Sequence, residues 1–217
     1  MIGNLVLTVV SLPRTHAYAL ASMEDQQITK VVLLGHSFIK RLDRFMRENA
    51  EDANLRLHTD KFEVIIRARG GLRVPLLACA LSRELDFEAS NGLVFLQIGG
   101  NDIKNNCNIS SIISAITSVA EYLIHTKDVR RVIIGQLFRR RPTVVGPMYN
   151  SHVININKGI EVWRKQSDCP ISFWKHRGFW DPDMNYLAND GVHLNKNKYM
   201  RKYLQSIKSA VLHASRQ

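Results

Sequence analysis

The chain alternates between short apolar runs and longer stretches in which apolar residues recur every three or four positions. The first pattern predicts strands buried on both faces, and the second predicts helices that bury one side. From residue 28 onward, strands are expected at about 29–34, 62–66, 93–98, 129–137 and 171–174. Helices are expected between and after them, at about 37–49, 76–81, 109–124, 149–165 and 198–213.

Strands that alternate with helices predict a parallel sheet with right-handed crossovers. We therefore expect an α/β fold with three α/β/α layers, in which a doubly wound, five-stranded parallel sheet has the flavodoxin-like order 2-1-3-4-5. No internal repeat, linker or second apolar core interrupts the pattern. Residues 28–217 are predicted to form one domain, preceded by a poorly defined lead-in over residues 1–27.

Two polar residues follow strands that the expected order makes neighbours. Ser37 comes directly after the first strand, and Asn101 comes just after the third. In such sheets ligands bind where the carboxyl ends of neighbouring strands meet. A hydroxyl at a strand-to-helix turn also lies beside free helix N–H groups, which stabilise negative charge. Serine is also a common helix cap, so Ser37 by itself fits either a residue of a ligand site or a cap.

Asp190 and His193 lie three residues apart in the loop before the last helix. An aspartate at this spacing can accept the imidazole Nδ1–H, which leaves the other ring nitrogen free to take a proton from a serine. By itself the pair is more typical of a polar surface or a helix start. His176 and Asp181 are alternative partners, but they lack this spacing.

Taken in order, these residues resemble the sequence blocks of the SGNH hydrolases, also called GDSL-type esterases and lipases. The four matching blocks are Gly35-His36-Ser37 for G-D-S, Gly71 (or Gly70) after the second strand, Gly99-Gly100-Asn101-Asp102 for G-x-N-D, and Asp190-Gly191-Val192-His193 for D-x-x-H. The resemblance covers about residues 28–213. The chain is similar to small intracellular platelet-activating-factor acetylhydrolase subunits, and its G-H-S-F start also resembles SGNH-like domains encoded in animal genomes, sometimes within retroelements.

The resemblance implies a serine esterase that removes a short acyl group, such as acetyl, from a small ester. Ser37 would be the nucleophile, His193 the general base and Asp190 the residue that orients His193. The oxyanion hole would combine the backbone N–H groups of Ser37 and Gly71 with the Asn101 side-chain amide. Neither a metal nor an organic cofactor is expected.

The chain departs from the family at one position, because His36 replaces the aspartate of the first block. A histidine there could place positive charge beside the nucleophile, or it could serve the structure of the turn. We favour the structural role, because a histidine can also satisfy turn hydrogen bonds. His36, Arg139 and Arg140 are candidate substrate contacts. The two arginines follow the fourth strand, at the edge where ligands bind, and arginine suits anionic groups.

The net charge of +11 comes entirely from the second part of the chain. Residues 127–217 hold 17 Lys and Arg against 6 Asp and Glu, whereas residues 1–126 hold 13 of each. This asymmetry indicates an anionic substrate or partner, or a solvated basic face. The resemblance to retroelement domains and this basic region together leave a second function open: a non-catalytic SGNH-like module of a mobile-element or multidomain protein, retained for protein association or for nucleic-acid association through residues 127–217.

Cellular location is predicted from weaker signals. Three cysteines without a zinc-like pattern indicate free thiols in a reducing compartment, and hence a cytoplasmic protein, with Cys79 buried in its helix. Secretion is the alternative, because residues 1–21 resemble a signal peptide that lacks its basic start. No apolar run approaches the roughly 20 residues that span a bilayer. The sequence does not predict an oligomeric state.

Overall fold

The computed structural model describes residues 27–83, 87, 89–196 and 198–217. Within these residues, five parallel strands form one sheet in the order β2-β1-β3-β4-β5. The strands are β1 (Thr29–Gly35), β2 (Phe62–Ala68), β3 (Leu93–Gln97), β4 (Arg131–Gly135) and β5 (Ile171–Trp174). The predicted topology and strand order are confirmed.

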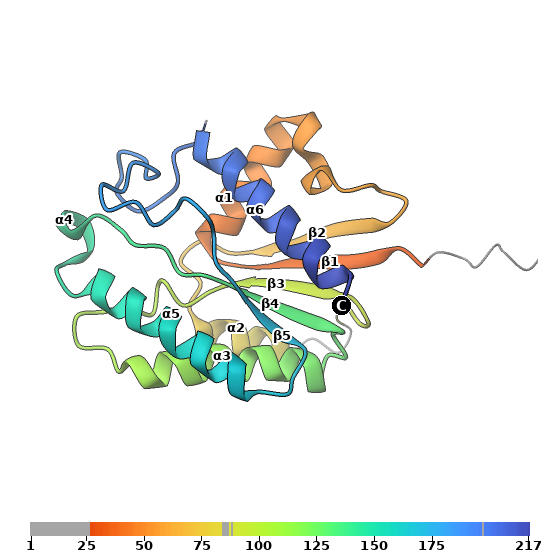
Figure 1. The fold of residues 1–217 in the computed structure, drawn as a ribbon, viewed down its shortest axis with the longest axis horizontal. Coiled ribbons are helices and arrows are strands. Elements are labelled where there is room, and N and C mark those ends of the chain that lie inside the picture. Colours follow the sequence, from red (N-terminus) through yellow and green to blue (C-terminus); the bar gives the residue numbers. More distant parts are fainter. Residues whose placement is uncertain (1–26, 84–86, 88, 197) are drawn as a thin grey trace, which may run out of the picture.

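Helices cover both faces of the sheet and give the predicted three layers (Figure 1). One face carries α1 (Ser37–Glu48), the 3₁₀ segment η2 (Ala50–Arg56) and α6 (Lys198–Ser215). The other face carries α2 (Val74–Arg83), α3 (Ile109–His125) and α5 (Tyr149–Gln166). The short helix α4 (Pro142–Val145) lies at one end of the sheet.

Strand β1 supplies alternate residues to two hydrophobic cores. Val32 and Leu34 pack in the core that includes α2, α3 and α5. Val31 and Leu33 pack in the core that includes α1 and α6. None of the four exposes more than 4% of its surface. Because burying one such side chain fully is worth about 1.5–3 kcal/mol, a continuous apolar run is what a central strand requires.

Gly35 allows β1 and β3 to approach closely where β1 ends. A Cβ on Gly35 would lie only 2.3 Å from the carbonyl oxygen of Gln97 in β3. The backbone N–H of His36 donates to the same carbonyl at 3.2 Å, and α1 begins at the next residue. The glycine of the first block therefore sets where the chain leaves the sheet.

Some local predictions differ from the structure. Cys79 is exposed rather than buried, because α2 turns Val74, Leu77 and Leu81 toward the core and Cys79 lies on another side of the helix. The fourth strand is shorter than predicted, and the arginine-rich loop after it runs into α4.

The signal-like segment of residues 1–21, and the lead-in up to residue 26, lie outside the described residues. The domain boundary therefore stays a prediction. Among the helices of the described residues, none combines the length and apolar character needed to cross a membrane.

Candidate active site

The loop between β5 and α6 lies at the same end of the sheet as α4 (Figure 1). It brings His193 to Ser37, which occupies the first turn of α1, although the two residues are 156 positions apart. The His193 Nε2 atom lies 2.9 Å from Ser37 Oγ. The His193 Nδ1 atom lies 2.9 Å from Asp190 Oδ2. The structure thus brings together three side chains that the sequence analysis expects to meet.

Local hydrogen bonds hold this loop in place. Asp190 Oδ1 accepts the backbone N–H groups of Val192 at 3.0 Å and His193 at 2.9 Å. The backbone N–H of Arg141 donates to the Gly191 carbonyl at 2.8 Å and ties the loop to the start of α4. Gly191 has a φ of +66°, and a Cβ there would lie 3.0 Å from Arg141 Cβ. The aspartate therefore shapes the turn and also contacts the imidazole.

The charge states at this site follow from burial and neighbouring charges. Burial raises the pKa of Asp190, but hydrogen bonds from the backbone of His193 and Val192 and from the His193 ring outweigh it and bring the pKa to about 2. Burial lowers the pKa of His193; the hydrogen bond to Asp190 opposes this shift, and Arg41 and Arg140 add to it. At neutral pH the site therefore holds an ionised carboxylate and a neutral imidazole, whose Nε2 can accept a proton.

Asn101, just beyond β3, links two other parts of this end of the sheet. Its Nδ2 donates to the Leu72 carbonyl at 3.0 Å, in the turn after β2. Its Oδ1 accepts from Arg140 at 3.1 Å. An amide nitrogen carries two hydrogens, so one remains available to a ligand.

The turn that Asn101 holds contains Gly71, whose φ of +70° favours glycine. Among the described residues, the Gly71 backbone N–H has no hydrogen-bond acceptor. Asp102 accepts the Val74 backbone N–H with both carboxylate oxygens at 3.2 Å, which fixes the start of α2 just after this turn. Residues of the G-x-N-D block thus hold the loop whose Gly71 N–H has no acceptor in the described part of the chain.

His36 caps α1. Its Nδ1 accepts the Phe38 backbone N–H at 3.4 Å, and only 1% of the residue is exposed. Burial, assisted by Arg140 and His193, lowers its pKa to about 3, so the ring is neutral at neutral pH. His36 therefore places no positive charge beside Ser37. A buried cap fits a histidine that satisfies the hydrogen bonds of the turn better than the predicted substrate contact. Ser37 is therefore the first residue of the helix and not its cap.

The side chains of the three consecutive arginines after β4 lie in different surroundings. Arg139 stacks on the Trp180 ring at 4.6 Å and donates to the Trp180 carbonyl. Arg140 is 8% exposed, lies over the Tyr149 ring and contacts Asn101. Arg141 is exposed. Of the two arginines expected to contact substrate, only Arg140 lies beside the predicted site residues.

Three cations on α1 lie beside the site but were not predicted from the sequence. Lys40, Arg41 and Arg44 line a pocket of about 390 Å³ that also includes Ser37 and His193. Positions 40 and 44 are one helical turn apart, so their spacing after Ser37 was a usable signal. A count of charges does not reveal this cluster, because the Lys and Arg of residues 1–126 equal the Asp and Glu in number.

The alternative partners lie elsewhere. The ring of His176 is buried, and its Nδ1 lies 2.8 Å from Ser206 Oγ. Asp181 accepts hydrogen bonds within its own loop, from Asp183 and Asn185. Within the described residues, neither His176 nor Asp181 forms a hydrogen bond with Ser37.

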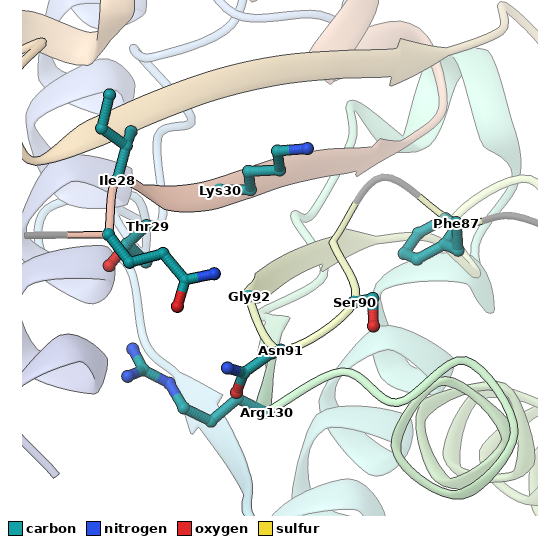
Figure 2. A pocket seen from close by; sticks show the side chains of 9 residues that line it. Ile28, Thr29, Lys30, Phe87, Ser90, Asn91, Gly92 and Arg130 are labelled. Carbon is teal, nitrogen blue, oxygen red and sulfur yellow. The ribbon is translucent and has the colours of Figure 1, made fainter. Parts of the chain in front are cut away.

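A larger hollow, of about 710 Å³, opens at the opposite end of the sheet, where β1 begins (Figure 2). Lys30, Ser90, Asn91 and Arg130 are among its lining residues. Ser90 donates to Asp128 and has no histidine beside it in the described part of the chain. We therefore place the candidate active site by the geometry around Ser37, not by cavity size.

Some cations of the basic second part are paired with carboxylates. Arg201 contacts the fully buried Asp52 at 3.0 Å, and Lys175 contacts Glu161 at 2.9 Å. The carboxylates of these ion pairs neutralise part of the positive charge of residues 127–217. Nucleic-acid association through this region stays a prediction.

No protein-family model matches the chain, and a sequence comparison with curated proteins also finds no match. Solved structures are similar to it. A GDSL-like lipase from Bacteroides thetaiotaomicron is 18% identical with a TM-score of 0.64, over 92% of this chain and 96% of that one. A lipase/acylhydrolase from Enterococcus faecalis is 16% identical with a TM-score of 0.60, over 85% and 97%. This chain has the SGNH-hydrolase fold.

The same SGNH-hydrolase fold occurs in an acetyl xylan esterase that is 17% identical, with a TM-score of 0.57 over 84% of this chain and 99% of that one. The resemblance drawn from the four sequence blocks is thus confirmed at the level of the fold. These three similar structures are a lipase/acylhydrolase, a GDSL-like lipase and an acetyl xylan esterase. Those activities are properties of the neighbours.

Proposed function

We propose that this chain is a serine esterase that cleaves short-chain, acetyl-like esters. The observation that carries the proposal is the continuous contact from Asp190 through His193 to Ser37, with two successive distances of 2.9 Å. A serine hydroxyl needs an adjacent base to become a nucleophile, and the base needs a third group to orient it. The names of similar structures, a lipase and a lipase/acylhydrolase, support an ester substrate, and an acetyl xylan esterase among them supports a short acyl group.

In the proposed reaction, Ser37 Oγ attacks the ester carbonyl carbon while His193 Nε2 takes the hydroxyl proton. Asp190 stabilises the imidazolium that forms. The tetrahedral intermediate then collapses, and His193 returns the proton to the departing alcohol. A water molecule, deprotonated by His193, then attacks the acyl-serine; the bond to Ser37 Oγ breaks, His193 returns the proton to that oxygen, and the carboxylic acid leaves.

The developing oxyanion requires fixed donors. We assign this role to the backbone N–H groups of Ser37 and Gly71 and to the second Nδ2 hydrogen of Asn101. Support comes from the free Gly71 N–H and from the contacts that fix both ends of the Asn101 amide. Losing one such donor typically costs about 3 kcal/mol of transition-state stabilisation.

A fluorophosphonate probe tests the nucleophile directly. We expect the probe to label the purified chain once, at Ser37, and the chain to hydrolyse para-nitrophenyl acetate. Ser37→Ala should abolish both, whereas the matched control Ser82→Ala, an exposed serine on α2, should retain both. A folded wild-type protein that is not labelled, or a Ser37→Ala protein that is still labelled, would contradict the proposal.

A further inference from the structure

We propose that the pocket beside Ser37 binds an anionic group, a carboxylate or a phosphate, carried by the ester substrate. This inference rests on the proposed esterase function and specifies its substrate class. The inference depends mainly on Lys40 and Arg44 of α1, and not on the excess of positive charge in residues 127–217.

The pocket is a small hollow that begins at the reacting atoms. It has a volume of about 390 Å³, and both Ser37 and His193 line it. Phe45, Leu194 and Met200 supply apolar surface that can hold the carbon part of a small molecule. A volume of this size suits a small substrate, since ligand pockets typically begin at roughly 300 Å³.

The charged lining of the pocket is strongly unbalanced. It consists of four cations and one carboxylate, namely Lys40, Arg41, Arg44, Lys196 and Glu48. A substrate group placed among these side chains therefore meets a positive potential, which the low-dielectric wall of the pocket strengthens.

Two of the four cations already have partners. Arg41 contacts Asp190 at 3.4 Å, and Lys196 pairs with Glu48. Within the described residues, the side chains of Lys40 and Arg44 have no acidic partner. These two charges are therefore available to a ligand.

The spacing of Lys40 and Arg44 does not itself stabilise α1. Lys40 and Arg44 are four residues apart on α1, and like charges at this spacing repel each other. Arg47, one turn further along the same helix, instead pairs with Asp43 at 3.0 Å. An anion bound between Lys40 and Arg44 would relieve the repulsion, and an arginine can bind a carboxylate or phosphate with two parallel hydrogen bonds.

Matched ester pairs test this inference, and they also locate the anion. One pair places the charge on the acyl side: mono-para-nitrophenyl succinate against para-nitrophenyl butyrate. The other places it on the alcohol side: para-acetoxybenzoate and para-acetoxyphenyl phosphate against para-methylphenyl acetate. At low salt, we expect the anionic member of at least one pair to have a kcat/KM about tenfold higher than its neutral analogue. The preference should shrink at high salt, because the pocket is open to solvent.

Arg44→Gln should lower the anionic-to-neutral ratio of kcat/KM about fivefold, chiefly through KM. Arg47→Gln is the matched control, since it removes the same charge from the same helix outside the pocket. Equal kcat/KM values within every pair, or equal effects of the two variants, would overturn the anion site and leave the esterase proposal standing.

A binding measurement separates this inference from the proposed function. Inorganic phosphate is titrated into Ser37→Ala protein and followed by NMR, with and without Arg44→Gln or Arg47→Gln. Binding that Arg44→Gln weakens and Arg47→Gln preserves supports the anion site, even if the chain hydrolyses no ester. No phosphate binding at millimolar concentrations, or equal weakening by both variants, contradicts it.

Discussion

One carboxylate and two arginines act on the charge of His193, and this environment determines when it can act as a base. Burial, Arg41 and Arg140 lower its pKa, while Asp190 opposes them. Since only the neutral ring accepts a proton, kcat/KM should rise with pH through this pKa. The acid limb of the pH profile should therefore lie below the ordinary histidine value of about 6.5.

Arg41→Gln should move that acid limb to higher pH, because it removes a positive charge that disfavours the imidazolium. The measurement is the pH dependence of kcat/KM for a neutral ester, compared with that of Arg47→Gln. A limb that stays in place, or one that moves equally in both variants, would show that Arg41 does not act on His193.

Arg140 is a positioning residue in the proposed mechanism, because it contacts the Asn101 amide oxygen at 3.1 Å. Asn101→Ala should lower kcat about 100-fold or more with little change in KM, since its donor acts in the transition state. Arg140→Met should lower kcat about tenfold by releasing the amide from its orientation.

A double-mutant cycle distinguishes this role from a general structural one. In the Asn101→Ala background, Arg140→Met should lower kcat little further, because the residue it orients is already absent. Steady-state kinetics of the four proteins provide the test. Fully additive effects on kcat would assign Arg140 a role independent of Asn101.

Among the elements, β1 and α1 position Ser37 and three cations of the pocket beside it. Buried Phe38, Ile39 and Leu42 hold α1 against the sheet, and its first residue is Ser37. The same helix turns Lys40 and Arg44 toward the pocket, one turn beyond the serine. The position of the whole unit depends on how closely β1 approaches β3.

Gly35→Ala should therefore lower the free energy of unfolding by about 3 kcal/mol, because the new Cβ meets backbone rather than a movable side chain. Urea denaturation measures the effect. Gly70→Ala is the matched control, since a Cβ there meets nothing within 4 Å. Similar losses in the two variants would contradict the close approach of β1 and β3.

For the molecule as a whole, two buried histidines couple stability to pH. His36 and His176 are each at most 2% exposed, and burial, the largest cause for each, lowers their pKa values to about 3. The unfolded chain keeps them near about 6.5, so it binds more protons between these values. The stability that the neutral rings contribute is present above pH 6.5 or so and is lost as pH falls toward about 3.

At about pH 5 this amounts to roughly 2 kcal/mol for each histidine. His176→Phe should reduce the loss between pH 7 and about 5 by that amount, and its ring can keep the stacking on Phe138. Urea denaturation at the two pH values measures it, with the exposed His58→Gln as control. An unchanged loss in His176→Phe would show that the buried ring is not the group that titrates.

The sequence alone determined the sheet and the positions of its polar residues. A strand buried on both faces requires a continuous apolar run, and a helix that buries one side requires apolar residues every three or four positions. Both patterns can be recognised directly in the sequence. The expected strand order then places Ser37 and Asn101 at one edge. The Asp190–His193 contact is local, within four residues, and is therefore readable from spacing.

Only the tertiary structure decided the remaining properties of the site. No local pattern distinguishes Arg140, which contacts Asn101, from Arg139, which stacks on Trp180, because both contacts join segments about 40 residues apart. The neutral state of His36 depends on burial by the whole fold. The basic pocket likewise requires α1 to lie beside the loop of His193 and Lys196. Burial and long-range contact set pKa values and side-chain directions, and neither exists until the chain has folded.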